Sequence, residues 1–167
     1  MNRLTGSDEY AKDQLFATLD TRTRRWQLPG WGPVLLSDTV GFIRDLPHQL
    51  VAGFKATLEE TRQADLLLHV ADASNPHAQE QISAVYKVLE ELGIHAKDTL
   101  LVLNKVDALQ DRGTLDRLLA LYPSAVPVSA RSGLGIPQLA RAVSDALSRN
   151  FRDVEVETSV ANGKPMA

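Results

Sequence analysis

Two nearly continuous apolar runs constrain the fold of this chain more than any other feature. They are DLLLHVAD, residues 65–72, and TLLVLN, residues 99–104. Each run has the length of a strand, and neither shows the alternation of a half-exposed strand. Such runs are typical of strands that are buried on both faces of a parallel sheet. AVPVSA, residues 125–130, is expected to form a third strand.

Helices are expected between these strands. Ser74 or Asn75 can cap a helix that ends near Gly93, a short helix is expected around residues 115–121, and Pro137 begins the last helix. Strand and helix therefore alternate along the chain. This order predicts an α/β fold with a mostly parallel sheet flanked by helices.

The segment before the first apolar run is expected to hold a hairpin and helical pieces. Residues 2–6, NRLTG, are typical of the last turn of a helix closed by glycine. Residues 24–39, RRWQLPGWGPVLLSDT, predict two antiparallel strands joined by a turn at Pro29 and Gly30. Residues 48–62, HQLVAGFKATLEETR, predict a helix with one apolar face.

The domain organisation follows from these elements. Residues 1–150 are expected to form a single domain. The segment DVEVETSV, residues 153–160, alternates as a new half-exposed strand does. Residues 151–167 are therefore expected to be the start of a C-terminal domain or a disordered tail.

Composition excludes several classes of function. The 167 residues contain no cysteine, which excludes disulfides and thiolate metal sites. The net charge of −3 gives no overall basic surface, so DNA is not an expected partner. No apolar run approaches the ~20 residues of a membrane-spanning helix, and the first residues lack the apolar stretch of a signal peptide. A cytoplasmic protein without a membrane partner is expected.

Two smaller features have simple interpretations. The four histidines show no spacing typical of metal ligands, and His69 is expected to be a core residue with satisfied hydrogen bonds. Three arginines gather at the start of the hairpin, where they form either a solvated strand edge or a contact for phosphate or RNA: Arg22, Arg24 and Arg25.

The tetrapeptide N-K-V-D, residues 104–107, is the most informative motif because it follows a buried strand directly. Ligands of open α/β sheets bind beyond the carboxyl ends of the strands. Guanine presents a ring N–H and an exocyclic amine side by side, and the Asp107 carboxylate can accept from both, whereas adenine has no matching donors. The amide of Asn104 can tie the loop together and reach the base edge, and the stem of Lys105 can lie along the ring face.

Two further motifs follow strands in the same way. In D-T-V-G, residues 38–41, the Asp38 carboxylate would hold Mg²⁺ through a water, and the Gly41 N–H would meet the terminal phosphate of a nucleotide. In S-A-R, residues 129–131, Ser129 and Ala130 would bring a backbone N–H to the guanine carbonyl. The order of the three motifs along the chain supports a guanine-nucleotide site.

This order of motifs resembles the translation-factor-related GTPases. The stretches NRLTGSDEYAKDQLFATLD, DTVGFIRDLPHQLVAGFKATLEE, ADLLLHVADAS and DVEVET resemble, more closely, the HflX-type ribosome-associated GTPases of the Obg–HflX superfamily. The resemblance implies a P-loop GTPase G domain with GTP or GDP as ligand, Mg²⁺ as cofactor and the large ribosomal subunit as partner. It also implies that Thr18 is the switch threonine that binds Mg²⁺. The nucleotide-binding residues expected are Asp38, Thr39, Val40, Gly41, Asn104, Lys105, Asp107, Ser129, Ala130 and Arg131.

Two departures from the GTPase pattern bear on activity. The phosphate-loop motif G-x-x-x-x-G-K-[ST] does not occur in the 167 residues. By resemblance, the chain is then expected to be truncated at both ends and to lack its first strand and phosphate loop. Phe42 stands where many GTPases carry a glutamine that orients the attacking water, so no catalytic residue is assigned and slow turnover is expected.

Three hypotheses remain open for the chain on its own. It is a GTP-hydrolysing domain, a module that binds guanine nucleotide without hydrolysing it, or an interaction-only piece that self-associates through an incomplete sheet. Selectivity for guanine over adenine separates the second from the third.

Overall fold

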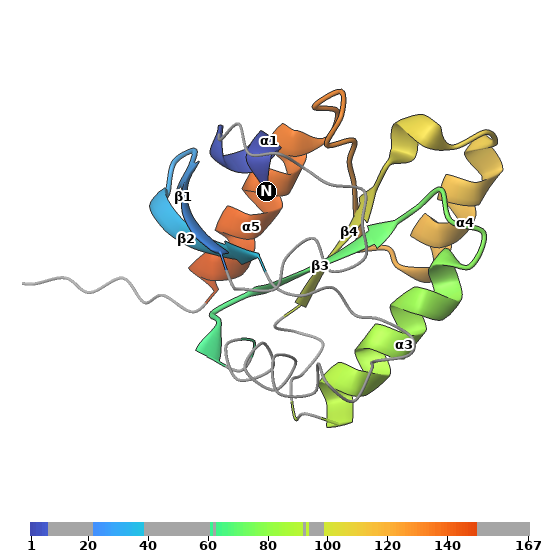
Figure 1. Ribbon diagram of the computed structural model, residues 1–167, viewed down its shortest axis with the longest axis horizontal. Coiled ribbons are helices and arrows are strands. Elements are labelled where there is room, and N and C mark those ends of the chain that lie inside the picture. The colour runs from blue at the N-terminus through green and yellow to red at the C-terminus, as the bar shows by residue number, and fades with distance from the viewer. Residues whose placement is uncertain (7–21, 39–60, 62, 92, 94–98, 150–167) are drawn as a thin grey trace, which may run out of the picture.

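A computed structural model describes residues 1–6, 22–38, 61, 63–91, 93 and 99–149 (Figure 1). The helix expected over residues 48–62 lies almost entirely outside this part of the chain, and so do the expected segment 153–160 and the domain boundary at residue 150.

The described residues contain a parallel sheet of the expected kind. Its strands are β3 (Leu67–Asp72), β4 (Thr99–Asn104) and β5 (Val126–Pro127), in the order β3-β4-β5. The helices that follow them in the chain are α3 (Ala78–Glu91), α4 (Arg112–Leu121) and α5 (Ile136–Ser148), and a one-turn helix η3 (Val106–Ala108) follows β4. The prediction of an α/β fold with a parallel sheet flanked by helices is confirmed.

Strand β4 is the centre of the core because both of its faces are covered. Leu101 and Leu103 belong to one buried cluster, which α3 and α4 cover with Ile82 and Leu118. Val102, which points to the opposite face, belongs to a second cluster. Alternate side chains of a strand point to opposite faces, so this division confirms that the second apolar run is buried on both sides.

Strand β3 differs from its prediction. It begins at Leu67 rather than at residue 65, and it was expected to be buried on both faces, but Val70 is 59% exposed. The physical reason is its place at the edge of the described sheet, where it pairs only with β4. An edge strand has one neighbour fewer to cover its side chains, and a nearly continuous apolar run does not reveal that position.

The hairpin forms a second, separate sheet. Strands β1 (Arg22–Leu28) and β2 (Gly32–Asp38) pair antiparallel, and Gly30 lies in the turn with φ +75°. Only glycine adopts such a φ without strain. Within the described residues, the hairpin forms no ladder with the parallel sheet.

The hairpin packs on the second cluster through its buried residues. Trp26 and Leu28 lie against Leu139 and Val143 of α5 and against Val102. Figure 1 shows the hairpin and α5 on one side of β4, with α3 and α4 on the other. The short helix α1 (Asn2–Thr5) ends at Gly6 in the left-handed conformation, as expected for a helix closed by glycine.

The helix caps explain where two helices begin. The Asn75 side chain accepts a hydrogen bond from the His77 N–H at 2.8 Å, so Asn75, one of the two expected candidates, caps the turn that leads into α3. Helix α4 begins three residues before the expected position because the Asp111 side chain accepts from the Gly113 N–H at 3.0 Å.

Removing this second cap gives a testable effect on stability. Asp111→Ala is expected to lower the free energy of unfolding by about 1 kcal/mol, because the Gly113 N–H in the first turn of α4 loses its side-chain partner. Urea denaturation measures the difference. Asp116→Ala, at an exposed position of the same helix, is the matched control and should change the midpoint far less. An equal loss in both variants would contradict the capping role of Asp111.

His69 does not have the environment that was expected of it. Its ring packs edge-on against Tyr86 with the ring centres 5.3 Å apart, yet its buried Nδ1 atom has no hydrogen-bond partner within the described part of the structure. The expectation of satisfied hydrogen bonds is wrong, because the aromatic neighbour fills the space without offering a partner to that nitrogen. Burial lowers the pKa of His69 to about 4.

The part of the chain that the structure describes contains no helix both long enough and apolar enough to cross a bilayer.

Candidate nucleotide-binding site

The N-K-V-D motif comprises the last residue of β4, a tight turn at Lys105 and the first two residues of η3. Lys105 has φ +64° and is the only non-glycine residue with a positive φ among the described residues. A left-handed conformation costs a non-glycine residue roughly 1–2 kcal/mol, so the surroundings must hold it. The N–H of Val106 donates to the Val128 carbonyl at 3.2 Å, and the N–H of Ala108 donates to the Lys105 carbonyl at 2.9 Å. The turn leaves Asp107 exposed.

A side-chain hydrogen bond joins this turn to the S-A-R loop. Asn104 Oδ1 accepts from the backbone N–H of Ala130 at 3.0 Å. The two residues are far apart in sequence, but they lie at the carboxyl ends of neighbouring elements of one parallel sheet. The Asn104 amide therefore links the two loops, as the first of its two expected roles, to tie the loop together, requires.

The loop after β5 takes its shape from Ser129. This residue is fully buried, and its hydroxyl oxygen accepts from the Ser132 N–H at 3.0 Å. Its carbonyl accepts from the Gly133 N–H, and its own N–H donates to the Leu134 carbonyl, both at 2.8 Å. Ser129 is fully buried whereas Ala130 is exposed, so Ala130 is the better candidate of the two to contact a guanine carbonyl. Its N–H would then be shared between that carbonyl and Asn104 Oδ1.

The same bonds explain why β5 is shorter than predicted. A strand over residues 125–130 was expected, and the structure places only Val126–Pro127 in the ladder. The Val128 N–H still donates to the Leu103 carbonyl at 2.8 Å, but from Ser129 onward the backbone bonds within its own loop. The end of the apolar run therefore belongs to the site rather than to the sheet.

Asp72 is a residue of this region that the sequence reasoning missed. It ends β3 opposite Asn104 in the parallel register. One carboxylate oxygen lies 2.8 Å from Lys105 Nζ, and the other accepts from the backbone N–H and the hydroxyl of Ser74, at 3.0 and 2.6 Å. The only signal in the sequence was an acidic residue at the end of a predicted strand.

The hydrogen-bond partners of Asp72 together affect the pKa of its carboxyl more than its partial burial does. Burial alone raises the pKa of this carboxyl, but the hydrogen bonds from Lys105 and Ser74, together with the lysine charge, hold the pKa below its ordinary value of 3.8. The carboxylate is therefore charged at neutral pH, and it fixes the head of the Lys105 side chain.

The lowered pKa of Asp72 predicts how its contribution to stability depends on pH. A carboxyl with a depressed pKa in the folded state stabilises the protein above its unfolded pKa, and the contribution is lost as the pH falls through the folded value. Asp72→Asn is expected to lower the free energy of unfolding at pH 7 by less than about 1 kcal/mol, since the ion pair is partly exposed. Urea denaturation at several pH values measures this difference, which should shrink progressively below pH 3.8. Asp145→Asn, on the exposed side of α5, is the control. A difference that persists unchanged in acid would contradict this account.

Asp38 is described, but the rest of its motif is not. It is an exposed residue at the end of β2, opposite Arg22 in the hairpin register. Since β2 belongs to the separate two-stranded sheet, the structure does not place Asp38 in the hydrogen-bonded sheet that carries Asn104. The expected site residues Thr18, Thr39, Val40 and Gly41, and also Phe42, lie outside the described residues.

Among the residues that the structure describes, Asp38 is the expected ligand of Mg²⁺. A carboxylate oxygen is the type of ligand that Mg²⁺ prefers, and this ion usually keeps several waters and takes few protein ligands. Among the described residues, no group of three acidic or histidine side chains gathers to hold a metal. A single contact through water is compatible with this arrangement.

The fold and the two joined loops define the class of the protein as a G domain, the α/β domain of GTPases. The chain belongs to the 50S ribosome-binding GTPase family, which matches residues 1–105. Its relatives within this family are the HflX GTPases, as the resemblance implied.

Two relatives show the extent of the similarity. GTPase HflX of Escherichia coli (strain K12) is 55% identical over 148 residues, which are 88% of this chain and 35% of that protein. GTPase HflX of Magnetococcus marinus is 48% identical over 166 residues, which are 99% of this chain and 38% of that protein. The chain thus spans little more than a third of the length of these curated relatives.

Solved structures agree with the fold. A variant of SsGBP superposes with a TM-score of 0.70 at 25% identity, over 88% of this chain and 51% of that one. A GTP-binding protein from Sulfolobus solfataricus in complex with GDP superposes with a TM-score of 0.68 at 24% identity, over 89% of this chain and 47% of that one. The second likeness concerns the fold alone.

Proposed function

We propose that the chain is the guanine-recognising part of an HflX-type GTPase, with GTP and GDP as ligands. The observation that carries the proposal is the hydrogen bond from the Ala130 N–H to Asn104 Oδ1, because it joins the two loops that would hold the base. Family membership supports guanine nucleotide as the ligand class.

Each residue of the proposed base site has a defined task. Asp107 accepts from the ring N–H and the exocyclic amine of guanine, and the Ala130 N–H is shared between Asn104 Oδ1 and the guanine carbonyl. Lys105, whose Nζ is held by Asp72, lays its stem along the ring face, and Arg131 borders the site from the same loop as Ala130. A base without the matching donors leaves polar groups unpaired, and this cost gives the selectivity.

The phosphate side of the site is proposed from the family pattern. Asp38 would hold Mg²⁺ through a water, Thr18 would contact the same ion, and Gly41 would donate its N–H to the terminal phosphate; Thr39 and Val40 complete this loop. When bound, Mg²⁺ would neutralise phosphate charge. Hydrolysis of GTP belongs to the proposed activity of the HflX-type protein. We propose that the 167 residues alone bind nucleotide without appreciable hydrolysis, since their sequence contains no phosphate-loop motif.

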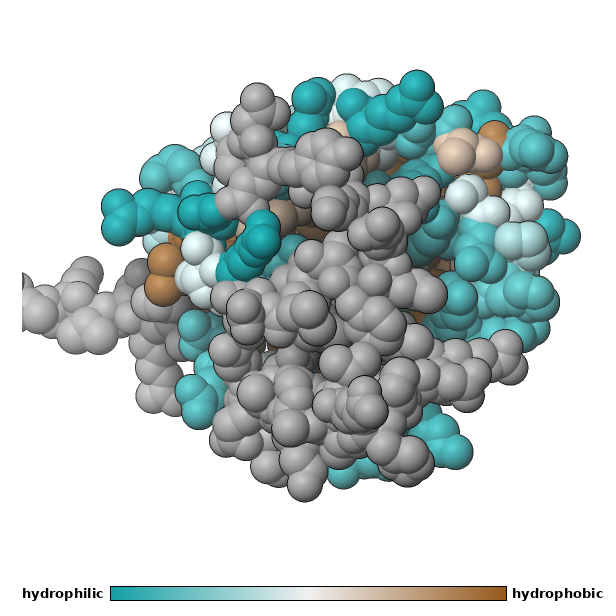
Figure 2. Space-filling view, in the orientation of Figure 1, coloured by the Kyte–Doolittle hydropathy of each residue, from teal (hydrophilic) through white to brown (hydrophobic). Residues whose placement is uncertain are grey.

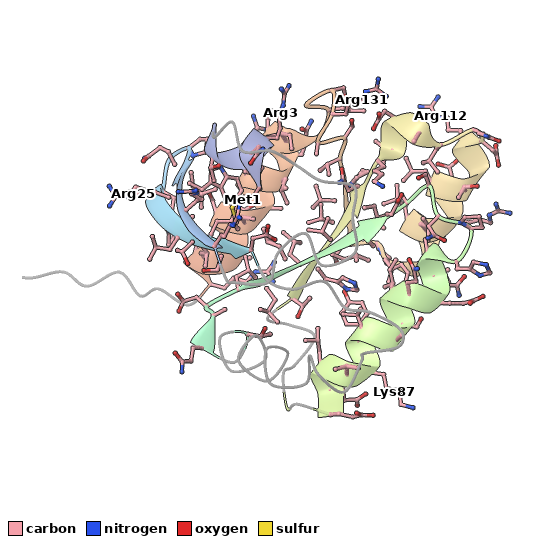
Figure 3. The ribbon with its side chains drawn as sticks, in the orientation of Figure 1. Met1, Arg3, Arg25, Lys87, Arg112 and Arg131 are labelled. Carbon is pink, nitrogen blue, oxygen red and sulfur yellow. The ribbon has the colours of Figure 1, made fainter. Side chains whose placement is uncertain are left out.

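The proposed partner is the large ribosomal subunit, and the proposed location is the cytoplasm. The relatives' family description supports the first. The exposed arginines at the start of β1, including Arg25 in Figure 3, support a contact with phosphate or RNA.

A second candidate function is self-association of the chain. Leu35 on the hairpin is 75% exposed and Val70 on the edge of the parallel sheet is 59% exposed. Figure 2 shows apolar atoms at the surface of the hairpin among hydrophilic side chains. Exposed apolar positions on strand edges favour pairing between copies. A concentration-dependent increase in sedimentation would support this candidate, and a monomer at all concentrations would contradict it.

A calorimetric titration of the chain with GDP and Mg²⁺, with ADP as the control, tests the proposed function. Binding of GDP without binding of ADP is the expected result. Binding of neither nucleotide, or of both equally, would contradict the proposed base site in this chain.

A further inference from the structure

Arg3 lies against the loop of Ala130, although 127 positions of sequence separate the two residues. Arg3 Nη2 donates to the Ser132 carbonyl at 3.1 Å. The guanidinium also occupies the space beside Gly133, since a Cβ atom on that glycine would collide with Nη2 and would lie 3.1 Å from Cζ. Figure 3 shows Arg3 at the upper edge of the molecule, where the loop leads into α5.

The helix that carries Arg3 is anchored to the hydrophobic core. Leu4, the next residue of α1, is partly buried and packs against the cluster that contains Trp26 and Leu139. Helix α1 therefore presents Arg3 from an anchored position, even though the arginine itself is exposed.

The loop has little freedom to adopt a different shape while these contacts exist. Ser132 is held from both sides, because its N–H donates to Ser129 Oγ and its carbonyl accepts from Arg3. Gly133 and Gly135 have φ values of +88° and +76°, and a Cβ on Gly135 would collide with the Pro127 carbonyl oxygen. Ser129, which accepts from the Ser132 N–H, is the residue directly before Ala130, so the contacts of Ser132 also fix the position of the Ala130 N–H.

We propose that Arg3 is a positioning residue for the base site, which holds the 129–135 loop in the shape that presents the Ala130 N–H. The inference rests on the proposed function and adds to it a residue outside the guanine motifs. Arg3 acts through Ser132 and Ser129, and it does not contact the base.

The test compares the affinity of Arg3→Ala and of the unmodified chain for guanosine and for GDP. Because one hydrogen bond that shapes the loop is lost, the affinities for guanosine and for GDP should both fall by the same factor, about 3- to 10-fold. Arg3→Lys, which keeps a donor, should restore part of the affinity. Arg141→Ala, which removes an exposed arginine from α5, is the matched charge control and should bind both ligands normally.

Three outcomes would overturn the inference. Unchanged affinity in Arg3→Ala would show that the loop keeps its shape without the arginine. A loss of affinity for GDP alone, larger at low salt than at high salt, would show that Arg3 contacts phosphate directly. An unchanged rate of amide hydrogen exchange at Gly133 in Arg3→Ala would show that the guanidinium does not hold the loop.

A different result separates this inference from the proposed function. If the unmodified chain binds neither guanosine nor GDP, the proposed base site fails, and the positioning role fails with it. If the unmodified chain binds both and Arg3→Ala binds equally well, only the positioning role fails.

Discussion

Asp107→Asn is expected to lower the affinity of the chain for GDP by about 100-fold or more, since two hydrogen bonds to a charged group are lost or reversed. The carboxylate accepts from two donors of guanine. An asparagine offers one acceptor oxygen and one amide NH₂ donor, and that donor would face the exocyclic amine of guanine, which is also a donor. Xanthine carries a carbonyl in place of that exocyclic amine, so the variant should bind xanthosine diphosphate more tightly than the unmodified chain does.

Competition binding with GDP and xanthosine diphosphate measures both changes in one experiment. Asp116→Asn, which removes an acidic side chain from an exposed position of α4, is the control and should keep the preference for GDP. A variant that loses both nucleotides together would show that Asp107 supports the fold of the loop. A variant that still prefers GDP would contradict the base-recognising role.

The free energy of unfolding should fall by about 3 kcal/mol between pH 6.5 and pH 4 because of His69, at 1.36 kcal/mol for each pKa unit. Burial lowers the pKa of this histidine from 6.5 to about 4. In that window the unfolded chain binds a proton at His69 and the folded chain does not. Stability from this group is therefore complete above pH 6.5, is lost as the pH falls, and changes no further below the folded pKa.

Urea denaturation at pH values from 7 to 4 measures this loss. His69→Phe removes the titrating group and keeps an aromatic ring beside Tyr86, so its stability should depend less on pH by the same amount. His77→Gln is the matched control, because His77 is exposed and pairs with Glu80 at 3.3 Å. A pH dependence that is identical in the unmodified chain and in His69→Phe would contradict the assignment.

The fold was predictable where both faces of an element are covered. The run at residues 99–104 is a strand with the predicted bounds, because the clusters on its two sides take up its four consecutive apolar residues, 100–103. The predictions for β3 and β5 were less accurate. The position of β3 at the edge of the described sheet and the bonding of Ser129 within its own loop both depend on partners distant in sequence.

The residues that we propose for guanine binding form a motif in the sequence, whereas the residues that we propose to support them do not. Asn104, Lys105 and Asp107 follow a buried strand in a pattern that suits one base. Asp72 and Arg3 have no such pattern, since each reaches this region through contacts with residues far along the chain. The positive φ of Lys105 was also not predictable, because lysine has no intrinsic preference for that conformation.

The central claim is that two loops, residues 104–107 and 129–131, form one site for guanine. Nuclear magnetic resonance of the backbone amides during a titration with GDP tests this claim most directly. The account predicts that GDP shifts the amide signals of Lys105, Asp107 and Ala130 in parallel, that those of α3 do not move, and that ADP moves none of them. Shifts that spare either loop, or equal shifts with ADP, would contradict it.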